Sequence, residues 1–254
     1  MSKNKRSTFS GKLGFVLSAA GASVGLGNIW RFPYLAAKYG GGIFLLVYII
    51  LALTFGYTMI MAETSLGRMT KKSPVGAYQS FGKSKWLSLG GWINAIIPIL
   101  IVPYYSVIGG WVIKYLIGYF SGQAQTLASD TYFSAFISNG ASTEICFIVF
   151  TFCTLGIIYA GVQNGIERVS KFMMPVLVVL SVIIAIYSVT RPGALEGVKY
   201  FLVPNPANFS WMTVVSAMGQ MFYSLSIAMG ILVTFGSYMK KDVSIEESTE
   251  NVEI

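Results

Sequence analysis

The sequence predicts an all-α integral membrane protein with six transmembrane helices. Apolar residues make up 54% of the 254 residues and charged residues only 11%, whereas a soluble domain carries about a quarter charged residues. Apolar stretches recur along the chain at about 20 residues, the length at which a helix crosses ~30 Å of hydrocarbon. Runs such as FLLVYIILAL (44–53) lack the strict alternation of membrane-barrel strands. Helices are therefore the expected spanning elements.

Each expected span is an apolar stretch between segments that are richer in Lys, Arg, Asn, Pro and Gly. The approximate centres of the spans are Leu26, Tyr57, Tyr105, Phe152, Leu180 and Ser226. The first stretch follows a basic segment, but it is too long and too interrupted for a cleaved signal peptide. The expected divisions are an N-terminal segment (1–12), the first five spans (13–190), an extracellular loop (191–210), the sixth span (211–240) and an acidic tail (241–254).

The distribution of basic residues predicts that both ends of the chain face the cytoplasm. With that orientation, thirteen of the eighteen Lys and Arg residues lie in inner segments, as the positive-inside rule requires. The net charge of +8 is then an insertion signal and an attraction to anionic lipid. No basic patch interleaved with aromatic residues indicates nucleic-acid binding. The expected surroundings are the lipid bilayer of the plasma or inner membrane.

Residues that support enzymatic chemistry are scarce. The sequence has no His, the commonest general base and metal ligand, and no Ser lies in a nucleophile-elbow or P-loop context. Five of the ten acidic residues fall in the last thirteen positions, which we expect to be a solvated tail. Glu63 is the acidic residue at membrane depth, and its expected role is structural, at the inner end of the second span. An enzyme is not predicted.

The stretch GASVGLGNIWRFP (21–33) interrupts the first span. Gly21 and Gly25 form a small-xxx-small pattern, whose simplest interpretation is a close contact between helices. Asn28 and Arg31 add polar groups at depth, which are costly in lipid unless they face a cavity or a partner. Taken alone, this stretch favours helix packing.

A second interruption lies in the sixth span, in QMFYSLSIAMG (220–230). Paired interruptions point to a transport site, because unwound backbone offers carbonyls to cations and amides to anions. Transport is therefore favoured over packing alone. One alternative is a scaffold in which glycines and tyrosines only pack helices. Another is a channel, which no repeated pore loop or charged ring supports.

Four stretches together resemble the neurotransmitter:sodium symporter family, in its bacterial amino-acid transporter branch. They are GASVGLGNIWRFPYLAAKYGGGIFLLVY, METSLGRMTKKSPVGAY, VPYYSVIGGW and GQMFYSLSIAMG. The resemblance covers residues from about 6 to 245. It implies the N-terminal half of an inverted-repeat fold of five plus five helices, with the first and sixth helices discontinuous. It also implies Na⁺-coupled symport of an amino acid by alternating access.

The resemblance implies two sodium sites built from oxygen ligands, which suit a hard cation. One Na⁺ would bind the backbone carbonyls of Gly21 and Val24. The other would bind the Ser23 carbonyl, the side-chain oxygen of Asn28, Ser224 and one oxygen of the substrate carboxylate. Chloride dependence is left open.

A substrate site is implied by the same resemblance. Its expected residues are Ser23, Gly25, Leu26, Gly27, Ile101, Tyr105, Tyr223, Ser224, Ser226 and Met229. The substrate carboxylate would meet the Leu26 and Gly27 amides and the Tyr105 phenol. Family members that carry monoamines place Asp at the position of Gly25, so glycine here favours an α-amino acid. The apolar wall, with its flexible Met229, favours a hydrophobic or aromatic side chain.

The resemblance also implies gates and a second half. Arg6 and Phe9 match the cytoplasmic gate, and Arg31 matches the arginine of the extracellular gate. Relatives have two five-helix repeats, whereas this chain stops in the loop after the sixth span. The expectation is a truncated member, which a complementary C-terminal half or a homo-oligomer would complete. The alternative is a membrane fragment that does not transport.

Overall fold

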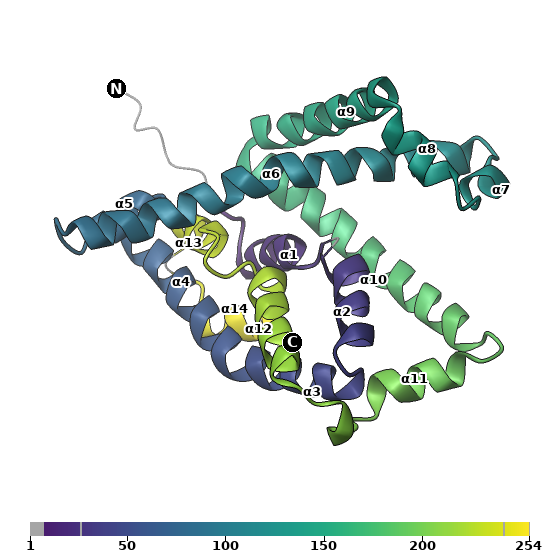
Figure 1. Ribbon diagram of the computed structural model, residues 1–254. Helices are drawn as coiled ribbons and strands as arrows, with labels where there is room; N and C mark the ends of the chain where they lie inside the picture. Colours follow the sequence, from purple (N-terminus) through teal and green to yellow (C-terminus); the bar gives the residue numbers. More distant parts are fainter. Residues whose placement is uncertain (1–7, 26, 241, 254) are drawn as a thin grey trace.

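The computed structural model describes residues 8–25, 27–240 and 242–253, and every regular element in that part of the chain is a helix (Figure 1). Four continuous helical segments are long and apolar enough to cross a membrane. They are Gly42–Thr70, Lys85–Phe120, Gly140–Tyr159 and Val162–Val189. A bent pair, Lys12–Ser23 with Gly27–Lys38, meets at 49° and adds a fifth candidate if it is counted as one span. The expected all-helical class is confirmed for the described residues.

The elements have the following bounds. Those before residue 121 are α1 (Lys12–Ser23), η1 (Gly27–Arg31), α2 (Phe32–Lys38), α3 (Gly42–Leu51), η2 (Ala52–Gly56), α4 (Tyr57–Thr70), α5 (Pro74–Gln79) and α6 (Lys85–Phe120). Those after it are α7 (Ala124–Leu127), α8 (Tyr132–Ser138), α9 (Gly140–Tyr159), η3 (Val162–Glu167), α10 (Arg168–Val189), α11 (Ala194–Leu202), η4 (Pro206–Asn208), α12 (Trp211–Ser224), α13 (Ile231–Tyr238) and α14 (Ile245–Glu253). The π-helical turns η1, η2 and η3 each continue directly into the α-helix that follows.

Polar caps fix where several of the long helices begin. The Ser84 side chain accepts a hydrogen bond from the Trp86 amide at the start of α6, at 3.3 Å. Asn139 accepts one from the Ser142 amide at the start of α9, at 3.1 Å. Ser210 forms a reciprocal capping box with Thr213 at the start of α12. Each cap satisfies a backbone amide that has no partner within its helix.

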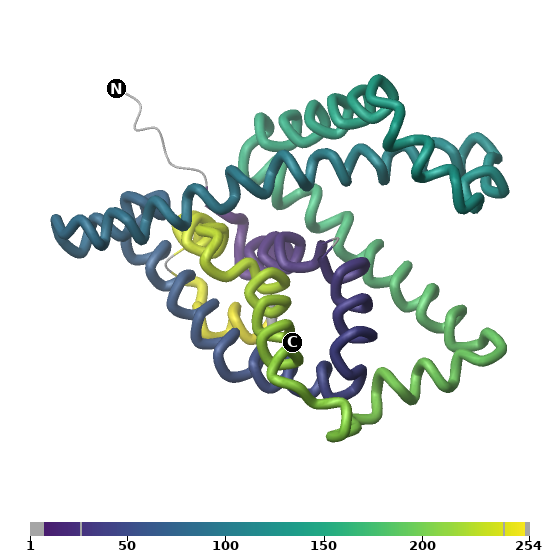
Figure 2. Tube along the Cα trace, viewed as in Figure 1, coloured from purple at the N-terminus to yellow at the C-terminus, as the bar shows by residue number. Residues whose placement is uncertain are grey.

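The interior of the molecule is organised around α1. This helix contacts α10, α13 and α14 (Figure 1). The long helix α6 runs across this group with α9 packed along it, as the Cα trace in Figure 2 shows. One buried cluster joins α4 to the α12–α13 region and consists of Ile60, Met221, Leu225, Ile227 and Leu232. The segment between α12 and α13 therefore packs through Leu225 and Ile227 against α4 and the two helices that flank it.

The acidic segment after residue 241 corrects an expectation. Sequence composition predicts a solvated tail there, but residues 245–253 form α14, which packs against α1 and α4. The Ser244 side chain accepts a hydrogen bond from the Glu247 amide at 3.3 Å, and acidic residues in the first turn suit the helix dipole. Lys12 pairs with Glu247 at 2.5 Å. The acidic composition concealed a capped helix that buries Ser248 and Thr249.

Ser10, just before α1, is tied to the start of α10 by a buried carboxylate that the sequence does not single out. Glu167 is 1% exposed. It accepts hydrogen bonds from the backbone amide and hydroxyl of Ser10 and from Lys171, the last at 2.6 Å. Gly14 makes this approach possible, because a Cβ at its position would lie 2.3 Å from a Glu167 oxygen. The start of α1 is thereby held against the start of α10.

Candidate functional site

The first break lies between α1 and η1. Helix α1 ends at Ser23, and Val24 takes an extended conformation with φ −91° and ψ 98°. The chain resumes as a helix when the amide of Asn28 donates to the carbonyl of Gly25 at 3.0 Å. The Asn28 side-chain amide turns back and donates to the Ser23 carbonyl at 3.2 Å. Leu26, predicted to bind the substrate carboxylate, lies outside the described residues.

The second break lies between α12 and α13. Three alternate residues of this segment, Ser226, Ala228 and Gly230, have φ angles of 55°, 59° and 68°. Non-glycine residues avoid this left-handed region, and such outliers persist only where surrounding contacts fix them. The Ser226 hydroxyl donates to the Ala22 carbonyl at 3.2 Å. The Ala228 amide donates to Glu63 at 2.7 Å. Helices α1 and α4 therefore hold this segment in place.

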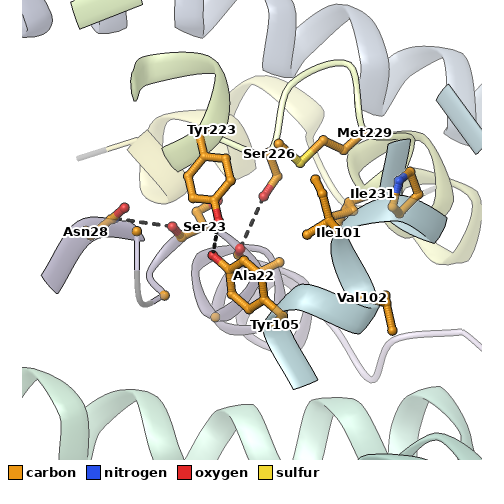
Figure 3. A pocket seen from close by; sticks show the side chains of 14 residues that line it. Ala22, Ser23, Asn28, Ile101, Val102, Tyr105, Tyr223, Ser226, Met229 and Ile231 are labelled. Carbon is orange, nitrogen blue, oxygen red and sulfur yellow. Dashed lines mark hydrogen bonds between the residues drawn. The ribbon is translucent and has the colours of Figure 1, made fainter. Parts of the chain in front are cut away.

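A cavity of about 270 Å³ opens between the two breaks and the middle of α6 (Figure 3). Its lining residues are Gly21, Ala22, Ser23, Gly25, Gly27, Asn28, Pro98, Ile101, Val102, Tyr105, Tyr223, Ser226, Met229 and Ile231. One end is polar and formed by the backbone of the first break. The opposite wall is apolar, where Ile101 lies beside Ile231 and Met229 (Figure 3). This combination suits a small ligand with one polar and one apolar end.

Most of the residues predicted for the site meet at this cavity. Gly21, Ser23, Gly25, Gly27, Asn28, Ile101, Tyr105, Tyr223, Ser226 and Met229 line it. Val24 and Ser224 do not line it. The Ser224 side chain instead lies behind the cavity wall, bonded to Asn28.

The wall behind Asn28 is a chain of oxygen-bearing side chains. The Ser224 hydroxyl donates to the Asn28 side-chain oxygen at 2.9 Å. Gln220, which is fully buried, donates to the Ser224 hydroxyl at 2.9 Å and to the Gly27 carbonyl at 3.2 Å. Within the described residues, the Gln220 side-chain oxygen and the Ser23 hydroxyl are buried without a hydrogen-bond partner. Hydroxyl, carbonyl and amide oxygens gathered in this way fit a hard cation better than a transition metal.

Two tyrosines separate the cavity from a smaller one beside Arg31. The Tyr223 hydroxyl donates to the Tyr105 hydroxyl at 2.7 Å (Figure 3). The smaller cavity is lined by Gly27, Trp30, Arg31, Tyr104, Tyr105, Ile108 and Tyr223. The Arg31 guanidinium carbon lies 5.1 Å from the centre of the Tyr223 ring, within cation–π range. Arg31 and the tyrosine pair therefore form one continuous side of the site.

The predicted gate residue Phe9 lies away from this side. Phe9 is 1% exposed and packs edge-to-face on Phe15 and Phe235. Its backbone amide donates to the Tyr238 carbonyl at the end of α13, at 3.2 Å. Arg6, predicted to close the cytoplasmic side with Phe9, lies outside the described residues.

Several contributors to the site escaped the sequence analysis. Pro98, Val102 and Ile231 line the cavity, and the Ala22 carbonyl anchors Ser226. The spacing of Pro98, Ile101, Val102 and Tyr105 on α6 gave a usable signal, because residues three and four apart share one helix face. The contact between Glu63 and Ala228 leaves no signal in the sequence, because the two residues are far apart along the chain.

Glu63 offers a test of how the second break is held. We expect Glu63→Leu to lower the free energy of unfolding by about 1–3 kcal/mol, because it leaves the part-buried Ala228 amide without an acceptor. Glu63→Gln keeps an acceptor oxygen at nearly the same place and should cost less. Thermal unfolding of the purified chain in detergent compares the two variants. Equal melting temperatures for Leu and Gln would contradict this role of the carboxylate oxygen.

The helices and the cavity together define a multi-pass α-helical membrane protein with a cavity between two helix breaks. The family model for the sodium:neurotransmitter symporters matches residues 6–140 and 119–252. The chain belongs to this family.

Individual relatives agree with this assignment. An uncharacterised sodium-dependent transporter of Bacillus subtilis, YhdH, is 37% identical, and the alignment covers 99% of this chain and 56% of that protein. The rat sodium-dependent neutral amino acid transporter B(0)AT1 is 27% identical over 92% of this chain and 42% of its own length. The crystal structure of MhsT in complex with L-phenylalanine superposes with a TM-score of 0.90 at 35% identity, covering 98% of this chain and 57% of MhsT. The chain thus spans about half the length of the relatives it matches.

Proposed function

We propose that this chain forms the ligand-binding half of a sodium-coupled symporter of hydrophobic or aromatic amino acids, working by alternating access. The observation that carries the proposal is the cavity between the two helix breaks, which brings freed backbone groups, Asn28 and an apolar wall together. Unwound backbone inside a membrane protein is tolerated where it lines such a cavity. Relatives that are sodium-dependent transporters support the same activity.

The proposed topology has six spans, of which the first and the sixth are discontinuous. The first would consist of α1 and the η1–α2 helix, and the sixth of α12 and α13. The 49° bend in the first and the left-handed residues in the second support this division. Both ends would face the cytoplasm, in the plasma or inner membrane, because most basic residues then lie on the inner side.

For sodium, we propose the ligands that the family resemblance implies. The Asn28 side-chain oxygen, the Ser23 carbonyl and Ser224 would form one site with the substrate carboxylate. Their present hydrogen bonds, from Ser224 to Asn28 and from Asn28 to Ser23, support this because they hold the three groups within reach of each other. When a cation binds, these hydrogen bonds would break, and the same oxygens would face the cation instead. The Gly21 and Val24 carbonyls would belong to the second site.

The substrate is proposed to lie with its carboxylate beside Gly25 and its side chain against Ile101 and Met229. The cavity of about 270 Å³ lies just below the usual range of ligand pockets, about 300 to 1,000 Å³. That size suits a single amino acid better than a peptide. The L-phenylalanine bound in MhsT supports a hydrophobic or aromatic side chain. The substrate ammonium would bind the carbonyls of Ser23, Tyr223 and Ser224.

Transport itself would require the region that relatives have beyond this length, from a complementary C-terminal half or from another copy in a homo-oligomer. Binding is therefore the direct test. Tritiated L-phenylalanine binding to the purified chain in lipid nanodiscs should be saturable in NaCl and absent in KCl of the same ionic strength. Equal binding in the two salts would contradict the proposal and favour a scaffold or a fragment that does not transport.

Asn28→Ala tests the proposed sodium site at a single residue. We expect it to raise the sodium concentration for half-maximal binding at least about tenfold, because a ligand oxygen is lost and the Ser23 and Ser224 partners lose their anchor. The control is Asn164→Ala, at an exposed position outside the cavity, which should leave the sodium dependence unchanged. The same sodium dependence in both variants would remove Asn28 from the site.

A further inference from the structure

The hydrogen bond between the two site tyrosines has a direction. In the bond from Tyr223 to Tyr105, the Tyr223 hydroxyl is the donor and the Tyr105 oxygen is the acceptor, at 2.7 Å. A phenol carries a single hydrogen, so Tyr105 keeps its own hydrogen for another partner. In the described part of the chain, no protein acceptor takes that hydrogen. The Tyr105 hydroxyl is therefore available to a ligand.

Arg31 provides a physical reason for this direction. Its guanidinium lies 5.1 Å from the Tyr223 ring centre, on the side of the smaller cavity. A positive charge over the ring withdraws electron density, which makes the Tyr223 hydroxyl a better donor and its oxygen a poorer acceptor. In the reverse direction the Tyr223 hydrogen would need another acceptor, and the neighbouring Arg31 offers only donors.

The Tyr105 hydroxyl lies next to the space that Gly25 leaves open. A Cβ built at Gly25 would lie 3.7 Å from the Tyr105 oxygen, in ordinary contact with it. The gap beside Gly25 and the available Tyr105 hydrogen thus meet at one point of the main cavity. A donor that already accepts a hydrogen bond is polarised and binds an anionic acceptor more strongly.

We propose that Tyr223 is a positioning residue that orients the Tyr105 hydroxyl as a donor to the substrate carboxylate. The order of bonds is Arg31 over the Tyr223 ring, Tyr223 to Tyr105, and Tyr105 to the carboxylate. Tyr223 thereby contributes to selection for ligands with an anionic group at this place. The inference rests on the proposed function, because it requires an amino acid in the cavity.

The test is a double-mutant cycle with phenylalanine at both positions, which removes each hydroxyl and keeps each ring. Binding of tritiated L-phenylalanine in NaCl is measured for Tyr223→Phe, Tyr105→Phe and the pair. We expect Tyr105→Phe to weaken binding about tenfold or more, and Tyr223→Phe to weaken it several-fold. The pair should bind as Tyr105→Phe does, because Tyr223 acts only through Tyr105. Tyr159→Phe, an exposed phenol at the end of α9 and outside both cavities, is the control and should bind normally.

The possible outcomes separate this inference from the proposed function. If the unaltered chain shows no sodium-dependent binding, both are overturned. If it binds but Tyr223→Phe has no effect, or strengthens binding, only the positioning role of Tyr223 is overturned. The same holds if the two substitutions add in full, since a tyrosine that merely closes the cavity would act independently of the Tyr105 hydroxyl.

Discussion

Gly25→Asp should abolish sodium-dependent binding of L-phenylalanine. The position faces Tyr105, with a Cβ there only 3.7 Å from the phenol oxygen. An aspartate would place its own carboxylate beside Tyr105, where the substrate carboxylate is proposed to bind. Two carboxylates at hydrogen-bond distance in a site of low dielectric repel strongly. We therefore expect at least about a hundredfold loss, which corresponds to roughly 2.7 kcal/mol.

Gly25→Ala is the matched control for space. The added Cβ makes only ordinary van der Waals contacts, at 3.7 and 4.0 Å from Tyr105, so binding should fall by less than about tenfold. The aspartate variant should in turn gain sodium-dependent binding of 2-phenylethylamine, an aromatic amine without a carboxylate. Retention of L-phenylalanine binding by Gly25→Asp would show that the carboxylate lies elsewhere.

The site was accessible from the sequence because its chemistry is local. The glycines and Asn28 of the first break, and the serines of the second, are uncommon in apolar stretches, so composition alone marked both segments. Resemblance to a family then supplied Ile101 and Tyr105 from a third, distant span. All of these except Ser224 line one cavity. Their roles toward substrate and sodium remain predictions.

What the sequence could not supply were contacts between distant residues. Glu63 holds Ala228, and Glu167 holds Ser10, across more than a hundred positions in each case. No local pattern selects one buried carboxylate's partner among many backbone amides. The helix α14 was hidden for a different reason, because an acidic composition typical of solvated tails also suits the first turn of a capped helix. The charge of this segment indicates exposure to solvent, whereas in the structure the segment packs against α1 and α4.

The crossing of α4 and α13 leads to a prediction about stability. The two helices pack with their backbones in contact at Gly67 and Gly236. A Cβ at Gly67 would lie 1.9 Å from the Val233 carbonyl oxygen, and one at Gly236 would lie 2.3 Å from the Thr64 carbonyl oxygen. Both obstacles are backbone atoms, so no rotamer change makes room. Small residues at such crossings let membrane helices approach closely.

Gly67→Ala should therefore lower the free energy of unfolding by about 3 kcal/mol or more, the upper range for overpacking. Relief requires α13 to move away from α4, which also pulls the second break away from Glu63. Thermal unfolding in detergent, read by loss of the monodisperse chromatographic peak, measures the effect. The matched control is Gly219→Ala on α12, where nothing lies within 4 Å of the added Cβ; alanine should there be neutral or stabilise by up to about 1 kcal/mol. Equal melting temperatures for the two variants would mean that α4 and α13 do not meet at their glycines, and that the second break is held by other contacts.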